Sequence, residues 1–458
     1  MLLLLSAVPA VPGPAAPEFA PSYFDDDGDG VDDRLIPLLA RGEAVNIFLV
    51  FDTKPGDAQR QALASLGLAP SYESHYLPVW QLDDVPAHKV SWLAALPDLR
   101  LVEWQAIYYP LLDKSVRAIK ARDSSTYDQV AWDRGLDGDG IVIAVLDTGV
   151  DNEHETFEGR FIAGVDCVSG CGDHTTEEDS GGDPDDRNGH GTHTASTALG
   201  TGGETDEDSD GEPDYMGVAP GARLVDVKVM TDIGAGGNVL QGIEWCTEHA
   251  DEDWDSSGSD GIQVMSMSVG TSGGSDGSDS VSQAANTAVA AGIVAVAAMG
   301  NDGDNVVPAP AAGDLVIAVG ATENPEDNVD RNDDLVASYS NYGPRDSDGD
   351  EDRWDELKPD VVAPGSDIHA AAGAPAPFTI ATDGYTTMDG TSMACPHVAG
   401  LAALMLQDDP ELEPGSSQNE MMWRMRNFSE PWGAASEPDN SSKYNYYSGW
   451  GYVDAWEF

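Results

Sequence analysis

Several segments of the chain are apolar without alternation, and each has about the length of one β-strand. Residues 141–146 read Ile-Val-Ile-Ala-Val-Leu, and residues 294–298 read Val-Ala-Val-Ala-Ala. A strand that is buried on both faces of a parallel sheet has this composition. Residues 398–406 are apolar over a length that suits a buried helix, and a further helix is expected from Tyr127 to Arg134. For residues 127–458 the pattern predicts an α/β fold, with a doubly wound, mostly parallel central sheet and helices on both faces.

A different pattern occupies residues 44–110. Residues 45–51, 76–82 and 101–109 are predicted strands, and residues 57–67 and 86–96 are predicted helices. This order resembles β-α-β-β-α-β, which is typical of a small α+β domain. We therefore expect a small α+β domain ahead of the larger one.

The first 43 residues belong to neither pattern. Residues 1–22 begin with an apolar run and continue into a Pro- and Ala-rich stretch, as in a signal-like segment followed by a linker, although the basic start of a signal peptide is missing. Residues 23–43 are acidic. No run in the sequence reaches the roughly 18 apolar residues needed to cross a bilayer. We expect a secreted, extracellular protein with no membrane span.

The charge balance narrows the class of partners. The chain of 458 residues has 82 acidic and 22 basic residues and a formal net charge of −60. Such a charge excludes nucleic-acid binding through electrostatic attraction. Because dissolved ions screen repulsion between like charges, the composition indicates a saline, halophile-like or calcium-containing medium.

Acidic residues alternate with other residues in two segments. The spacing D-x-D-x-D-G-x-x-D occurs within residues 25–33 and again within residues 206–214. Alternating carboxylates with a glycine at the turn suit a hard cation such as Ca²⁺, and the alternative is an acidic, solvated linker. A third acidic cluster, residues 346–352, lacks the glycine at the sixth position. The candidate calcium ligands are Asp25, Asp27, Asp29, Asp33, Asp206, Asp208, Asp210 and Asp214.

Ser392 lies in Gly-Thr-Ser-Met-Ala-Cys-Pro-His, directly before the apolar run of the predicted helix. Pro396 falls where the first turn of a helix tolerates proline. Free backbone N–H groups and the helix dipole would then favour negative charge beside the Ser392 side chain. Acyl transfer needs this environment for its nucleophile and its oxyanion, whereas most serines in such a place only cap the helix.

Two upstream motifs add an acid and a base. Asp147 ends the apolar strand in Asp-Thr-Gly, at the carboxyl end where doubly wound sheets carry functional groups. His190 and His193 lie in Gly-His-Gly-Thr-His-Thr. A zinc site is the rival interpretation of the two histidines, but neither has the adjacent Glu of an H-E-x-x-H motif. Spacing alone does not say which histidine acts.

Together the three motifs, in the order Asp, His, Ser, resemble those of the subtilisin-like serine proteases over roughly residues 127–458. The resemblance implies that Asp147 orients the imidazole, His190 is the general base and Ser392 is the nucleophile. It also implies that Asn301, after the strand at residues 294–298, donates to the oxyanion. The cleft segments implied by the resemblance contain Gly234, Gly236, Ser268, Val269 and Gly270.

The same resemblance implies a mode of production. We expect a secreted serine endopeptidase that hydrolyses peptide bonds through an acyl-enzyme on Ser392 and is made as a self-processing proenzyme. Residues 44–110 would be an inhibitor-like propeptide, and residues 111–126 would be a processing linker. Residues 111–126 contain a cluster of basic residues, and the other interpretation of this cluster is a helix salt-bridged to the acidic body. The expected partners are protein or peptide substrates and the protein's own propeptide, on a monomer. Structural Ca²⁺ is expected, since subtilisins commonly carry a calcium loop near residues 206–214, and no catalytic cofactor.

A function of another class is the alternative. A protease-like fold without activity could serve as a calcium-dependent surface or adhesion protein. Such a copy would be expected to lack at least one of the four catalytic positions, and this chain has Asp147, His190, Asn301 and Ser392. Among the cysteines, Cys167 and Cys171 are close enough in sequence to form a small disulfide, and Cys246 and Cys395 are expected to be buried thiols.

Overall fold

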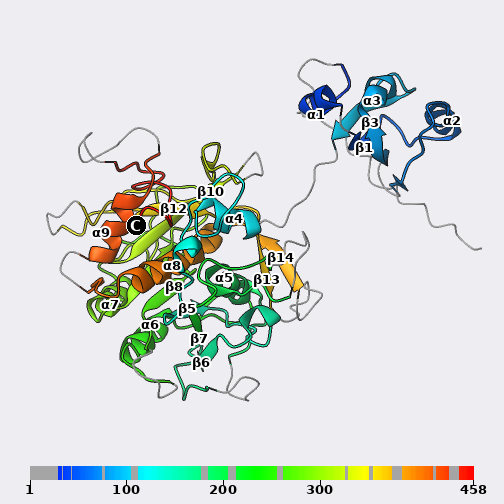
Figure 1. The fold of residues 1–458 in the computed structure, drawn as a ribbon. Helices are drawn as coiled ribbons and strands as arrows, with labels where there is room; N and C mark the ends of the chain where they lie inside the picture. Colours follow the sequence, from blue (N-terminus) through cyan, green and yellow to red (C-terminus); the bar gives the residue numbers. More distant parts are fainter. Residues whose placement is uncertain are drawn as a thin grey trace, which may run out of the picture. The chain divides into compact units, whose positions relative to one another are not determined.

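The computed structural model describes residues 29–32, 35–42, 44–74, 78–104, 112–176, 184–204, 213–254, 261–324, 329–349, 354–373, 384–415, 419–432 and 443–458. The chain divides into two compact units, Met1–Tyr109 and Pro110–Phe458 (Figure 1). Among the helices that the structure describes, none combines the length and the apolar character of a membrane span.

The first unit is an α+β domain. Its sheet has the order β2-β3-β1-β4 and consists of β1 (Ala44–Phe51), β2 (Tyr72–Glu73), β3 (Val79–Pro86) and β4 (Leu99–Trp104). The helices are α1 (Ile36–Arg41), α2 (Asp57–Ser65) and α3 (Ala87–Leu93). Strand β3 runs four residues beyond the predicted end at Leu82, because a bulge in its pairing with β1 lets both Leu82 and Val85 face the core.

The second unit is built on an eight-stranded sheet. Its order is β11-β10-β9-β8-β5-β7-β6, with β12 paired to β10, and every pair except β10–β11 is parallel. The strands are β5 (Val142–Asp147), β6 (Phe161–Asp166), β7 (Arg223–Lys228), β8 (Val264–Met267), β9 (Val294–Ala298), β10 (Ile317–Glu323), β11 (Leu335–Val336) and β12 (Val361–Pro364). A separate hairpin joins β13 (Ile368–Ala372) to β14 (Gly384–Met388).

Helices cover both faces of this sheet (Figure 1), which confirms the predicted fold class. Ile143 and Val145 of β5 pack in the core that contains α5 (His190–Leu199) and α8 (Thr391–Asp408). Val142, Ala144 and Leu146, which alternate with them, pack in the core that contains α6 (Val239–Glu248) and α7 (Ser280–Ala290). A strand covered on both faces has no solvent side, and this explains its unalternating sequence. Helix α9 (Glu420–Phe428) adds Met421, Met422 and Met425 to the α5–α8 core.

The segment that joins the units differs from an exposed linker. Residues 112–118 form α4, and Ser115, Val116 and Ile119 are buried in the second unit. The Lys120 ammonium lies 2.6 Å from Asp454 Oδ2, so this residue of the basic cluster is salt-bridged to the acidic body.

The helix predicted at Tyr127–Arg134 is wrong for most of its length, because only Trp132–Arg134 forms a 3₁₀ turn. The backbone N–H groups of Ala131 and Trp132 donate to the carbonyls of Lys120 and Ala121 instead of continuing a helix. The cysteine interpretation is borne out, since Cys167 and Cys171 form a disulfide and both Cys246 and Cys395 are buried free thiols.

Candidate active site

Asp147 and His190 meet at the carboxyl edge of the sheet. Asp147 ends β5 and is fully buried, while His190 opens α5 with about a quarter of its side chain exposed. His190 Nδ1 donates to Asp147 Oδ1 over 2.7 Å, and Asp147 Oδ1 also accepts from Thr148 N at 2.7 Å. A Cβ atom at Gly191 would lie 2.0 Å from Gly149 O, so only glycine permits this approach of α5 to the end of β5. The Nδ1–H bond leaves the lone pair on Nε2 of His190.

The structure separates His190 from His193 by their electrostatics. Burial lowers the pKa of His190, but the carboxylates of Asp147 and Asp186 outweigh it, so the pKa of His190 is raised above its ordinary value. His193 is fully buried, and its Nε2 lies 3.0 Å and 3.2 Å from the carbonyl oxygens of Ile368 and Thr386. Burial lowers the pKa of His193 to about 3. His193 is therefore a structural residue, and no zinc site forms between the two histidines.

Asp186 is a residue that the sequence reasoning missed. Its buried carboxylate accepts five hydrogen bonds, from the backbone N–H groups of Asn188, Gly189 and Thr192 and from the hydroxyls of Thr148 and Thr192. These bonds fix the first turn of α5 against the end of β5, and thus fix the orientation of His190. The available signal was an Asp three residues before the glycine that precedes the helix.

Ser392 is the second residue of α8 and is half-buried. Its hydroxyl donates to Ser268 O over a long 3.5 Å, and it makes no hydrogen bond to His190 in the described part of the chain. The Ser268 hydroxyl in turn donates to Ser392 O at 2.7 Å, which joins the end of β8 to the start of α8. Beneath the serine, Cys395 is fully buried and burial raises the pKa of its thiol to about 12, so it is not a nucleophile.

Asn301 and the backbone of Ser392 present two N–H donors to one place. Asn301 Oδ1 accepts from Thr391 N at 2.8 Å and from Thr391 Oγ1 at 2.9 Å, which fixes the side-chain amide. A methyl group at Gly390 would lie 3.2 Å from Asn301 Nδ2 and 3.5 Å from Ser392 N. Neither donor has a hydrogen-bond partner among the described residues. Thr391, which the sequence reasoning did not single out, is the residue that orients this amide.

The two predicted cleft segments border the site. Asn188 Nδ2, in the loop before His190, donates to Asp232 O at 3.1 Å and lies 3.2 Å from where a Cβ of Gly234 would be. Residues 268–270 follow β8 directly, and the carbonyl oxygen of Ser268 accepts the hydrogen bond of the Ser392 hydroxyl. Within the described ranges, the backbone groups of Gly236, Val269 and Gly270 make no hydrogen bonds. Free backbone groups on both sides are what an added extended strand requires.

The predicted calcium ligands fall mostly outside the description. Asp25, Asp27, Asp33, Asp206, Asp208 and Asp210 are not among the described residues. Of the other two, Asp29 accepts a hydrogen bond from Val31 N at 2.8 Å, and Asp214 is buried.

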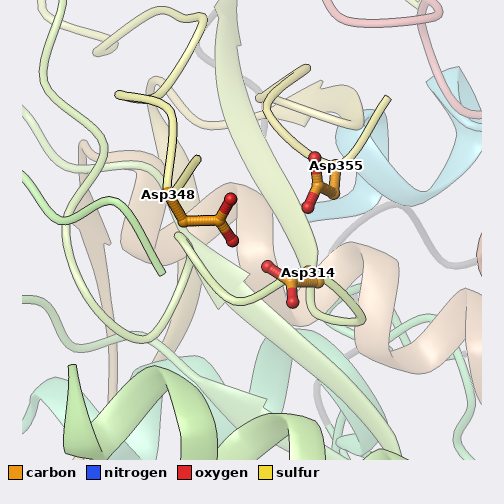
Figure 2. Close-up of side chains that lie close together, drawn as sticks. All are labelled: Asp314, Asp348 and Asp355. Carbon is orange, nitrogen blue, oxygen red and sulfur yellow. The ribbon is translucent and has the colours of Figure 1, made fainter. Parts of the chain in front are cut away.

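A different acidic group converges in the structure. Figure 2 shows the carboxylates of Asp314, Asp348 and Asp355 turned toward one space, and an oxygen of each lies within 4.8 Å of the others. The buried guanidinium of Arg345 forms ion pairs with all three carboxylates. Its Nη2 lies 2.8 Å from Asp314, 3.6 Å from Asp348 and 2.9 Å from Asp355. A metal ion here would be placed against a fixed positive charge, so this group does not fit one.

A carboxylate–imidazole pair, a serine at a helix N-terminus and two free N–H donors, all on one edge of a doubly wound sheet, define a serine hydrolase. Residues 138–451 match the model of the subtilase family, and the chain belongs to that family. It is a subtilisin-like serine endopeptidase, which acts on peptide bonds.

Individual relatives agree with this assignment. The chain is 32% identical over 361 residues to serine protease AprX of Bacillus subtilis (strain 168). The aligned region covers 76% of this chain and 73% of AprX. It is 33% identical over 294 residues to subtilisin DY of Bacillus licheniformis, covering 63% of this chain and 84% of that protein. Among solved structures, sphericase superposes with a TM-score of 0.55 at 31% identity, over 74% of this chain and 97% of sphericase.

Proposed function

We propose that peptide hydrolysis proceeds through an acyl-enzyme on Ser392, with Asp147 and His190 completing the triad. The observation that carries the proposal is the Asp147–His190 hydrogen bond of 2.7 Å together with the two free donors beside Gly390. The Ser392 hydroxyl is held only by a long 3.5 Å contact with Ser268 O, which leaves it available to a base. Catalytic hydrogen bonds are often formed only when substrate is bound.

In this mechanism His190 Nε2 takes the proton of Ser392 as Oγ attacks the scissile carbonyl carbon. The imidazolium is stabilised by the buried Asp147 carboxylate, which also keeps the Nδ1–H tautomer. Asn301 Nδ2 and Ser392 N donate to the oxyanion of the tetrahedral intermediate. His190 then protonates the leaving amine. In the second half of the reaction His190 takes a proton from water as the water oxygen attacks the ester carbonyl, and it gives a proton back to Ser392 Oγ as the acyl group leaves.

Substrate would bind as an extended strand between the segments around Gly234 to Gly236 and Ser268 to Gly270. The free backbone groups of Gly236, Val269 and Gly270 support this, because they can pair with the peptide main chain whatever its side chains. The enzyme should therefore accept many sequences and select among them through side-chain pockets.

We further propose that the protein is secreted as a self-processing proenzyme in which the first unit is the inhibitory propeptide. The burial of Ser115, Val116 and Ile119 in the second unit supports a cut on the amino-terminal side of Leu112. Asp206, Asp208, Asp210 and Asp214 would hold one Ca²⁺ ion, and Asp25 to Asp33 would hold a second ion in the precursor. The repeated D-x-D-x-D-G-x-x-D spacing supports both sites.

Labelling with a phosphonofluoridate tests the nucleophile. The purified parent should incorporate one equivalent and lose activity, whereas Ser392→Ala should incorporate none and accumulate as an uncut precursor. Ser280→Ala is a matched control, because Ser280 is exposed and also lies in the first turn of a helix, α7. Labelling of Ser392→Ala, or its normal processing with no other protease present, would contradict the proposal.

A further inference from the structure

Two histidines share a surface pocket in the second unit that has no part in the proposed mechanism. The pocket has a volume of about 410 Å³, and one of its walls is a stripe of α6 that contains Trp245, Glu248 and the residue after the helix, His249. The other wall is the loop after the Cys167–Cys171 disulfide, which carries His174. The two histidines, 75 positions apart in sequence, thus meet only through the fold.

His249 is held in one tautomer. Its Nδ1 lies 2.7 Å from Trp245 O, and because a carbonyl oxygen can only accept, Nδ1 carries the proton. Its ring lies beside both Trp245 and Trp254, with centroids 4.0 Å and 5.5 Å away. The Nε2 lone pair has no partner among the described residues. An imidazole that donates one N–H to a backbone carbonyl and leaves the other nitrogen free has the arrangement of a metal-binding histidine.

His174 lies at the distance that a shared ion would impose. Its ring centroid is 5.6 Å from that of His249, at an interplanar angle of 81°, and neither of its nitrogens is hydrogen-bonded within the described ranges. A metal–nitrogen bond of about 2.1 Å plus roughly 1.1 Å from nitrogen to ring centre puts each centroid about 3.2 Å from the ion. At a tetrahedral angle, two such rings have centroids about 5.2 Å apart. The observed separation of 5.6 Å is therefore close to the value for a shared ion.

Carboxylates are available to complete the coordination. Asp173, Glu244 and Glu248 line the same pocket, are exposed, and make no ion pair in the described part of the chain. One of them must turn inward to become the third ligand, which exposed side chains do readily. His249 follows the last residue of α6, where the helix dipole favours positive charge.

We propose that His174 and His249, with one of these carboxylates, bind a borderline divalent transition-metal ion, of which Zn²⁺ is the type. Imidazole nitrogens favour Zn²⁺ or Cu²⁺ over Ca²⁺, so the site is chemically distinct from the acidic calcium loops. An ion held by both histidines clips the disulfide loop to the carboxyl end of α6. Helix α6 begins two residues after Gly237, at the end of the proposed cleft segment, so the ion would steady the helix that supports one wall of the cleft.

Zinc binding to the full-length Ser392→Ala protein, which cannot digest itself, tests the proposal. After removal of metals by a chelator, isothermal titration should show one tight Zn²⁺ per chain in the presence of excess Ca²⁺. His174→Ala should weaken that binding at least tenfold to a hundredfold, since loss of a direct ligand costs no less than loss of an outer-shell partner. His88→Ala is the matched control, because His88 is also exposed and contacts a tryptophan ring, Trp92, at 5.8 Å.

A second measurement identifies the ligand atoms directly. Cu²⁺ bound to the parent should give an electron paramagnetic resonance spectrum with splitting from two nitrogens, and from one nitrogen in His174→Ala. Equal zinc affinity in His174→Ala and His88→Ala, displacement of Zn²⁺ by Ca²⁺, or a copper spectrum without nitrogen splitting would each overturn the proposal.

Discussion

Replacing Asp360 by Asn should strongly destabilise the second unit, although it changes the side chain by one atom. Asp360 is fully buried, and Lys358 and Arg426, also buried, face it from two sides. Its Oδ1 accepts from Arg426 Nε at 2.6 Å, and its Oδ2 accepts from Lys358 Nζ at 3.1 Å and Ala318 N at 2.7 Å. An amide keeps the shape but leaves two buried cations without their counter-charge.

The size of the effect follows from the burial of the cations. Breaking a buried ion pair by removing one partner costs about 3–5 kcal/mol. The second unit, Pro110–Phe458, has about 350 residues, and unfolding entropy of about 2.1 cal/mol/K per residue gives it roughly 0.7 kcal/mol/K. The melting temperature of Asp360→Asn should therefore fall by about 4–7 °C.

Asp408→Asn is the matched control, because it removes the same charge from an exposed pair. Asp408 Oδ1 lies 2.6 Å from Arg134 Nη2, and the two side chains are 28% and 29% exposed. Such a pair contributes about 1 kcal/mol at most, or less than about 2 °C. In a chain of net charge −60, either variant relieves general repulsion equally, so their difference isolates the buried interaction.

Thermal unfolding followed by circular dichroism, in the Ser392→Ala background, measures both variants. Lys358→Met added to Asp360→Asn should recover part of the loss, because it removes one uncompensated charge. Burial raises the pKa of Asp360, but Arg426 and Lys358 outweigh it, so its pKa is lowered. The contribution of Asp360 is then present above the unfolded pKa, about 3.9, and is lost as pH falls through the lower folded pKa. A melting temperature of Asp360→Asn equal to that of Asp408→Asn at pH 7 would refute the reasoning.

Three further predictions concern activity and calcium. Asn301→Ala should lower kcat by about a hundredfold or more and leave KM nearly unchanged, the size usual for one oxyanion donor; a raised KM with unchanged kcat in steady-state assays would mean that Asn301 only positions substrate. His190 acts as a base only when it is neutral, and its pKa is raised, so kcat/KM should rise with pH through a midpoint above about 6.5. Asp147→Asn should move that midpoint lower, and an unmoved midpoint would contradict this explanation. Calcium at about a hundred times its dissociation constant should stabilise mature Ser392→Ala, prepared by cutting its precursor in trans with the active enzyme, by roughly 2.7 kcal/mol in calorimetry at fixed high ionic strength. An equal response from Asp208→Ala/Asp210→Ala would show that the loop is only acidic surface.

The fold class could be predicted because the pattern of β5 reports its surroundings directly. Residues 142–146 have no polar position, and the structure packs alternate residues of this run on two different helix layers. The helix predicted at residues 127–134 was wrong, because the local sequence does not show that the N–H groups of Ala131 and Trp132 donate to the carbonyls of residues 120 and 121. A local sequence pattern therefore predicts an element well where burial decides its conformation, and poorly where hydrogen bonds to another segment decide it.

The candidate site was predictable to the extent that its residues lie in specific motifs. The family resemblance selects His190 over His193, and the fold supplies the physical reason, because the His190 ring meets Asp147 while the His193 ring meets two carbonyl oxygens. Asp186 and Thr391 escaped because they act on the backbone or side chain of a neighbour, and aspartates and threonines with that role are common at helix starts. The His174–His249 pair escaped for a related reason, since 75 positions of sequence separate them.

The charge composition acquires a different meaning once burial is known. At least six of the 22 basic residues are buried, against nine of the 82 acidic residues among those described. Arg345, Arg426 and Lys358 lie inside and hold carboxylates, so they do not screen the surface. The rest of the chain is consequently more acidic in proportion than the whole. Screening by salt acts on exposed charges and scarcely on buried pairs, so we expect added salt to stabilise the protein through its surface. The penalty for losing a buried partner, as in Asp360→Asn, should then be nearly the same at low and high ionic strength.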